Sequence, residues 1–110
     1  MNELNSVTAL YKALDKKFAQ DIILMDLRNV TPIADFFVIC TAGSAPQMAA
    51  LTETAEETLL EQGMKLFHTE GVAKWVLLDF GTVIVHIFDK ESREYYNLER
   101  TWGDAKLIKP

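Results

Sequence analysis

The sequence is poor in cysteine and histidine, and it has no long apolar run. Cys40 is the one cysteine among 110 residues, so the chain can form no internal disulfide and no cysteine-based zinc site. The two histidines lack a clear third ligand, which argues against a metal centre. No apolar run approaches the ~18 residues that a spanning helix needs. Residues 1–6 also lack the basic and then apolar order of a signal peptide. We therefore expect a cytoplasmic protein with no membrane contact, no metal and no other cofactor.

Basic residues are also fewer than acidic ones. The chain has 11 lysines and arginines against 16 aspartates and glutamates, which gives a formal net charge of -5. Lys12, Lys16 and Lys17 lie close together, but Asp15 and Asp21 balance them. A phosphate backbone repels an acidic surface, so sequence-specific binding to nucleic acid is not expected. A basic protein partner fits this charge better.

A single domain over residues 1–110 is expected, because nearly half of the residues are hydrophobic and can supply a core. Apolar spacing, β-branched runs and turn residues predict eight elements in the order α-β-β-α-β-β-β-α. They are a helix at 5–19, strands at 21–27 and 36–41, a helix at 44–62, strands at 64–68, 75–80 and 83–88, and a helix at 90–101. This order predicts an α/β fold in which a mixed sheet of about five strands is flanked by helices.

Local signals mark the ends of several elements. Asn5 or Ser6 is expected to cap the first helix, and Ser44 the second. Gly63 is placed to end the second helix in a left-handed turn. Residues 105–110 are expected to fray. The inner face of the first helix is predicted to consist of Val7, Leu10, Tyr11, Leu14 and Phe18.

The turn Gly43-Ser44 is a plausible anion site, because backbone N–H groups point outwards at the start of a helix. It supports an alternative interpretation as a nucleotide-binding or nucleotidyltransferase-type module. Such an enzyme needs paired carboxylates on a strand, whereas Asp79 is followed two residues on by Gly81. His86 is expected to be a structural histidine on the more polar sheet face rather than a base. We therefore do not expect an enzyme.

Aromatic residues crowd the C-terminal half of the chain. Trp102 and one of the neighbours Tyr95 and Tyr96 are expected in the core. The other tyrosine should be exposed, because neighbours on a helix point about 100° apart. For Trp75, core and interface stay equally open. Exposed tryptophan and tyrosine beside charged residues are typical of binding hot spots.

Residues 70–88 combine such groups on a predicted hairpin. One strand carries Trp75 and Asp79, the pair Gly81-Thr82 makes a tight turn, and the return strand carries His86. Adjacent strands place an aromatic ring, a carboxylate and an imidazole in one neighbourhood. This mixture favours recognition of a basic protein surface over catalysis.

A further signal is an ordered set of short segments along nearly the whole chain. They are Asp35-Phe36-Phe37-Val38-Ile39-Cys40, Gly43-Ser44 with Gln47, Glu70-Gly71, Trp75-Val76-Leu77-Leu78-Asp79, Val83-Ile84-Val85-His86-Ile87-Phe88, Arg93, Tyr95-Tyr96, Leu98-Glu99, and Trp102 with Asp104-Ala105. In this order they closely resemble the ribosomal silencing factors, also called the Iojap-like family. The resemblance implies a nucleotidyltransferase-like α/β fold without the catalytic carboxylates. It also implies binding to the large ribosomal subunit through its protein L-fourteen, which blocks joining of the small subunit and represses translation when nutrients are scarce.

The hairpin and the final helix are expected to form the partner-binding surface. Its predicted residues are Glu70, Lys74, Trp75, Asp79, Phe80, Arg93 and Tyr96. Trp75 and Phe80 would supply apolar area, and the acidic residues would pair with lysine or arginine of the partner. The family often has tyrosine in place of Phe80 and an acid in place of Thr82, so a polar contact is expected to be weaker here by about 1 kcal/mol. Half-exposed aromatic residues also predict a homodimer when the partner is absent.

Overall fold

The computed structural model describes residues 3–71 and 73–109. Its elements are helices α1 (Glu3–Lys16), α2 (Ala45–Glu61), α3 (Lys90–Tyr96) and α4 (Leu98–Thr101), and strands β1 (Gln20–Asp26), β2 (Phe36–Thr41), β3 (His68–Glu70), β4 (Trp75–Asp79), β5 (Val83–Phe88) and β6 (Lys106–Ile108). The strands form one sheet in the order β3-β4-β5-β2-β1-β6. Strands β2 and β5 are parallel, and the other neighbouring strands are antiparallel. The predicted class, an α/β fold with a mixed sheet, is confirmed, with six strands in place of about five.

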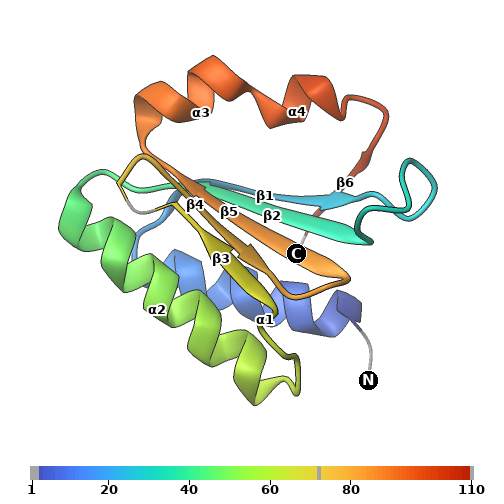
Figure 1. The fold of residues 1–110 in the computed structure, drawn as a ribbon, viewed down its shortest axis with the longest axis horizontal. Coiled ribbons are helices and arrows are strands. Elements are labelled where there is room, and N and C mark those ends of the chain that lie inside the picture. The colour runs from blue at the N-terminus through green and yellow to red at the C-terminus, as the bar shows by residue number, and fades with distance from the viewer. Residues whose placement is uncertain (1–2, 72, 110) are drawn as a thin grey trace.

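Helices cover both faces of the sheet, with α1 and α2 on one side and α3 and α4 on the other (Figure 1). Each side has its own apolar cluster, because successive residues of a strand point to opposite faces. The larger cluster joins α1 and α2 to alternate residues of the strands, and Cys40 lies within it, as predicted. Burial raises the pKa of the Cys40 thiol to about 12, so the thiol stays protonated. The smaller cluster lies under α3 and α4 and contains Phe37 and Phe88.

Several local predictions are confirmed. Ser44 caps α2 in an extended conformation, and its hydroxyl accepts a hydrogen bond from the Gln47 N–H at 3.2 Å. Gly63 follows α2 with a φ of 83°, the left-handed turn expected there. Gly81, with a φ of 85°, opens the tight turn between β4 and β5. A positive φ costs glycine little, which explains both positions.

The first helix ends before the predicted residue 19. Phe18 adopts a φ of 64° and is 82% exposed, so it does not belong to the inner face. The N–H of Ala19 bonds to the carbonyl of Leu14 at 3.1 Å, which closes the helix around this left-handed residue. Asn5 and Ser6 lie inside α1, so the prediction that one of them caps it was wrong.

The final helix is divided in two. Asn97 has a φ of 43°, which ends α3, and its side-chain oxygen accepts a hydrogen bond from the Arg100 N–H at 3.3 Å to begin α4. Asparagine tolerates the left-handed region better than most residues, so it suits this position. The apolar residues keep helical spacing across Asn97, so the sequence predicted one continuous helix.

Two strands also differ from the prediction. Strand β3 starts at His68, where the predicted strand at 64–68 ends. Strand β6 pairs antiparallel with β1, with Leu107 opposite Met25, so the prediction that this segment frays was wrong for residues 106–108. The last residue, Pro110, lies outside the described residues. Within the described ranges, no helix is both long and apolar enough to cross a membrane.

Candidate functional site

Side chains of β3 and β4 on the α3 side of the sheet stay accessible, whereas those of β5 on the same side are buried. Directly paired residues share a face, and Glu70 lies opposite Leu77 while Leu77 lies opposite His86. Glu70 is exposed and Leu77 is half-buried, but His86 is buried. On this face of the sheet, the side chains are therefore covered at β5 and exposed to solvent at β3. We call the residues Glu70, Trp75, Leu77, Asp79 and Tyr96 the open sheet face.

Trp75 is the centre of the open sheet face. Its ring stacks on Phe88, with 4.9 Å between ring centroids, and contacts Tyr96 at 4.5 Å. The same residue lines a hollow of about 200 Å³ together with Glu70 and Leu77. The indole thus packs against the smaller core cluster and also borders solvent. The sequence left a core role and an interface role open for Trp75. In the structure its side chain packs on the core and is also accessible at the surface.

A buried histidine lies beneath Trp75. The Trp75 Nε1–H donates a hydrogen bond to His86 Nδ1 at 3.1 Å. His86 also packs against the ring of Phe37, with 4.6 Å between centroids. The predicted alternation of the strand holds, but this face is aromatic rather than polar, because α3 and α4 cover it. Burial lowers the pKa of His86 to about 4, so the ring is neutral near pH 7.

Two carboxylates give the open sheet face its charge. Glu70 is exposed and its Oε1 lies 3.2 Å from the Nε2 of His68. Asp79 accepts a hydrogen bond from the N–H of Gly81 at 2.7 Å, which tightens the hairpin turn. Both acids stay outside the core: Asp79 continues the row of Trp75 and Leu77 along β4, and Glu70 lies beside Leu77 on the outer strand β3. The surface is therefore apolar along its middle and acidic at its margins.

Gly71 supports the open sheet face from the loop before β4. Its φ is 82°, and a Cβ added there would lie 1.8 Å from the carbonyl oxygen of Trp75. No other residue fits this close approach without a shift of the backbone. Glycine at this position thus allows the chain to pass directly against the start of β4.

Two of the predicted contact residues, Phe80 and Arg93, do not lie on the open sheet face. Phe80 follows Asp79 along the chain, so it points to the opposite face, where it is buried in the core with α1 and α2. Arg93 is 8% exposed and binds groups of β1, β2 and α4. Neither side chain offers much surface to a partner. Lys74 is exposed but lines another hollow, beside α2. Leu77, missed from the sequence, follows from simple alternation with Trp75.

The aromatic residues of the final segment are more exposed than predicted. Tyr95 is 80% exposed and Tyr96 is 46% exposed, so neither is a core residue. Tyr96 lies over Trp75 at the margin of the sheet rather than over its centre. Trp102 is half-buried and packs edge-on against Phe37, with 5.9 Å between ring centroids. The prediction of one buried tyrosine was wrong, and Trp102 only partly takes the core position expected of it.

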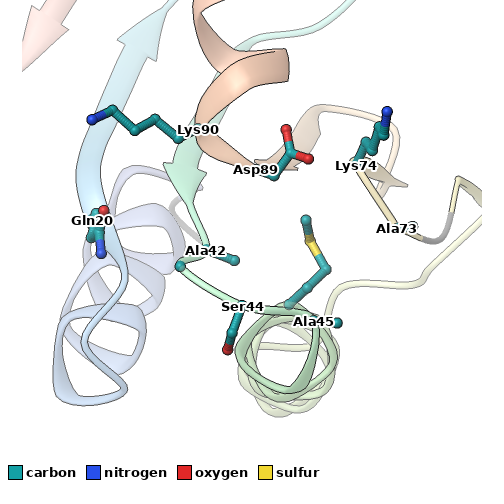
Figure 2. A pocket seen from close by; sticks show the side chains of 10 residues that line it. Gln20, Ala42, Ser44, Ala45, Ala73, Lys74, Asp89 and Lys90 are labelled. Atoms are coloured by element: carbon teal, nitrogen blue, oxygen red, sulfur yellow. The ribbon is translucent and has the colours of Figure 1, made fainter.

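The turn Gly43-Ser44 borders a second hollow, of about 570 Å³. It lies at the ends of the parallel strands β2 and β5, the usual position for a ligand in an open α/β sheet. Figure 2 shows the Asp89 carboxylate between Lys74 and Lys90 at this hollow, with the start of α2 opposite.

Two polar groups of this second hollow, Ser44 and Asp89, already cap helices. The Ser44 hydroxyl caps α2, and the side chain of Gln47, which lies outside the lining, donates to the carbonyls of Lys17 and Phe18 at 3.1 Å and 2.9 Å. Asp89 caps α3, and the hydrogen bond from the Ser92 N–H lowers the pKa of its carboxyl. An ionised aspartate repels a phosphate. Among residues 3–71 and 73–109, no three side chains of histidine, cysteine, aspartate or glutamate gather in a way that could hold a metal ion.

Comparison with known proteins points to one family. Residues 1–110 match the family described as "Ribosomal silencing factor during starvation". A protein named "Ribosomal silencing factor RsfS" from Bacillus subtilis is 39% identical over 109 residues, which is 97% of this chain and 92% of that protein. The protein of the same name from Halalkalibacterium halodurans is 41% identical over 98 residues, 87% of this chain and 84% of that one. "Protein Iojap, chloroplastic" from Zea mays is 36% identical, over 96% of this chain and 46% of its own length.

Solved structures give the same result. A crystal structure of a protein from Chromobacterium violaceum superposes with a TM-score of 0.88 at 30% identity, covering 94% of this chain and 88% of that one. A crystal structure from Bacillus halodurans superposes with a TM-score of 0.82 at 32% identity, covering 97% and 99%. The relatives carry the names of regulatory factors rather than of enzymes. The match of fold and sequence over nearly the whole length has one consequence: the chain belongs to the family of ribosomal silencing factors.

Proposed function

We propose that this protein silences ribosomes in the cytoplasm by binding the large subunit through ribosomal protein L-fourteen. The bound factor sterically blocks the small subunit and represses translation when nutrients are scarce. Family membership supports the ribosome as target, because the relatives are named for ribosomal silencing. The observation that carries the choice of surface is the open sheet face, where Trp75 packs against Tyr96 and lines a hollow with Glu70, and where Asp79 lies further along the same strand.

The chemistry of the open sheet face fits a basic protein. Interface hot spots are enriched in tryptophan and tyrosine that bury apolar area at the centre of the contact. Trp75 and Tyr96 are already packed together at 4.5 Å, so little side-chain freedom is lost on binding. Glu70 and Asp79 can pair with lysine or arginine at the margins. The net charge of -5 adds long-range attraction to a basic partner.

Size alone makes the blocking mechanism physically reasonable. The molecule measures 33 × 31 × 25 Å along its principal axes. A folded body of this thickness on a contact surface holds two partners well beyond van der Waals distance, and a close-packed domain does not compress. No catalytic step is needed.

Subunit joining on a sucrose gradient tests this proposal. Purified large subunits are incubated with the protein and then mixed with small subunits. The proposal requires that the peak of assembled ribosomes falls and that the protein travels with the large subunit. Normal joining, with the protein left at the top of the gradient, would contradict it.

We expect Trp75→Ala to weaken binding to large subunits by about 2 kcal/mol, or roughly 30-fold in Kd, as truncation of a hot-spot residue does. Co-sedimentation across a concentration series measures the change. Phe18→Ala is the matched control, since Phe18 is also an exposed aromatic residue but lies near β1, away from β3 and β4. Equal binding by the folded Trp75→Ala protein would remove Trp75 from the site.

The alternative function, nucleotide binding at Gly43-Ser44, has the hollow of about 570 Å³ in its favour. Its capping groups are engaged and Asp89 is ionised, so we expect no saturable heat in calorimetry with nucleoside triphosphates and magnesium. Saturable binding that is lost on Lys90→Ala would revive the alternative. Binding that Lys90→Ala leaves unchanged would place the nucleotide elsewhere.

A further inference from the structure

His86 is a polar side chain in a place that suits an apolar one. It is 4% exposed and lies among aromatic rings. The ring of Phe37 meets it edge-on, and the ring of Phe88 is parallel to it, with 6.1 Å between centroids. No charged group contributes to the shift of its pKa, which comes from burial. The imidazole is therefore a neutral group in apolar surroundings.

Of the two ring nitrogens of His86, Nδ1 has a hydrogen-bond partner among the described residues and Nε2 has none. Its Nδ1 accepts from the Trp75 Nε1–H, and a neutral imidazole that accepts at Nδ1 carries its proton on Nε2. This Nε2 is buried and has no hydrogen-bond partner within residues 3–71 and 73–109. A leucine would fill the space without leaving a buried donor unsatisfied. The polarity of His86 thus weakens the core locally, and what it provides is an acceptor for Trp75.

We propose that His86 is a positioning residue for partner binding, which fixes the indole of Trp75 in the orientation presented on the open sheet face. This inference rests on the proposed function. The second torsion of a tryptophan side chain has broad minima, so the ring has several orientations before its neighbours restrict it. The hydrogen bond from the indole N–H to His86 Nδ1 selects among them, together with the packing. The ring then lies on Phe88 and Tyr96, with its remaining edge towards solvent.

A matched pair of substitutions separates positioning from packing. Asparagine and leucine have nearly the same shape, so His86→Asn and His86→Leu leave similar space in the core. Asparagine keeps an acceptor close to the position of Nδ1, and leucine has none. We expect His86→Leu to weaken binding to purified large subunits about tenfold, and His86→Asn to stay within about threefold of the unaltered chain. Equal weakening by both folded variants would reduce His86 to a packing role.

The indole signal reports positioning without any partner. The two tryptophans, Trp75 and Trp102, give two indole N–H resonances, and Trp102→Phe assigns them. In the unaltered protein, the Trp75 N–H should exchange with solvent more slowly than that of Trp102. His86→Leu should speed this exchange and move the resonance, and His86→Asn should restore most of the protection. A Trp75 signal that exchanges fast in the unaltered protein, or that ignores His86→Leu, would overturn the proposal.

A double substitution links the two effects. Trp75→Phe removes the indole donor, so in that background His86→Leu should cause no further loss of binding. A further loss there would show that His86 acts by another route. If Trp75→Ala leaves binding intact while the indole signal still depends on His86, the proposed surface fails but the positioning stands. The two failures are thus distinguishable.

Discussion

Arg93→Ala is expected to lower the free energy of unfolding by about 3 kcal/mol, the largest effect that we expect from a single side chain outside the apolar core. The guanidinium donates to the Thr41 hydroxyl at 2.8 Å and to the carbonyl of Asp21 at 2.9 Å. Its Nε lies 3.2 Å from the Glu99 carboxylate. Removing the arginine leaves a carboxylate, a buried hydroxyl and a carbonyl without their donor. Urea unfolding measures the change.

The arginine network explains how α3 and α4 stay on the sheet. It joins α3 to the end of β2, the start of β1 and the helix α4, so one side chain ties four elements together. Arg93→Lys is the control, since lysine keeps the charge but lacks the planar fork of donors. We expect it to lose about half as much stability as Arg93→Ala. A loss below about 1 kcal/mol for Arg93→Ala would show that apolar packing alone holds the two helices.

Binding by the arginine variants separates two roles for this residue. The sequence placed Arg93 on the contact surface because it is charged and lies near two tyrosines. In the structure it is directed at neighbouring elements and is nearly covered. Folded Arg93→Lys should therefore bind large subunits as the unaltered chain does. A charged residue in the sequence thus indicates an interface only when the fold leaves its side chain accessible.

Elements governed by short-range chemistry were predicted well. The run of β2 is apolar on both faces, since it lies at the centre of a covered sheet, and its bounds were predicted correctly. The cap at Ser44 and the turn at Gly81 depend on neighbouring atoms within a few residues. These signals stay the same whatever the rest of the chain does.

Elements that depend on distant contacts were missed. Strand β6 has three residues, and it exists because β1 offers an edge to Leu107 and its neighbours. The break at Asn97 lets Leu98 of α4 pack against the smaller cluster. The apolar spacing of the segment alone does not predict this contact. Phe18 looked like a core residue by spacing, but the helix ends first. Tertiary pairing decides all three cases.

The candidate surface was predicted in part for the same reason. Strand alternation put Trp75 and Asp79 on one face, and the structure agrees. The same alternation directs Phe80 into the core, so the expected loss of a surface contact from the missing tyrosine hydroxyl does not apply at that position. Sequence alone could not show which strand edge the helices leave open. That depends on where α3 ends, and hence on Asn97.

The free energy of unfolding should fall by about 3 kcal/mol as the pH drops from 6.5 to about 4, because His86 must stay neutral in the fold. Burial lowers the pKa of His86 from 6.5 to about 4, and each unit corresponds to about 1.4 kcal/mol. Between these values the unfolded chain binds the proton and the folded chain does not. Stability therefore rises with pH across this window and is constant above it.

The acidic residues with shifted pKa values act in a different range. A hydrogen bond from Arg28 lowers the pKa of the Asp26 carboxyl, and one from Ser92 lowers that of Asp89. Their stabilisation is present above the ordinary carboxyl pKa of 3.8 and is lost as the pH falls below it. The slope between pH 6.5 and 4 should thus belong to His86.

Urea unfolding of the unaltered chain and of His86→Leu at several pH values measures this slope. Leucine cannot take up a proton, so the His86→Leu protein should show little change between pH 6.5 and 4. The other histidine, His68, is exposed and serves as the control, since His68→Ala should keep the slope of the unaltered chain. If His86→Leu keeps that slope as well, other groups cause it. The folded protein must then accept a proton on His86 without losing stability. The ring would then have a partner for its second nitrogen, and the polarity of His86 would not serve Trp75 alone.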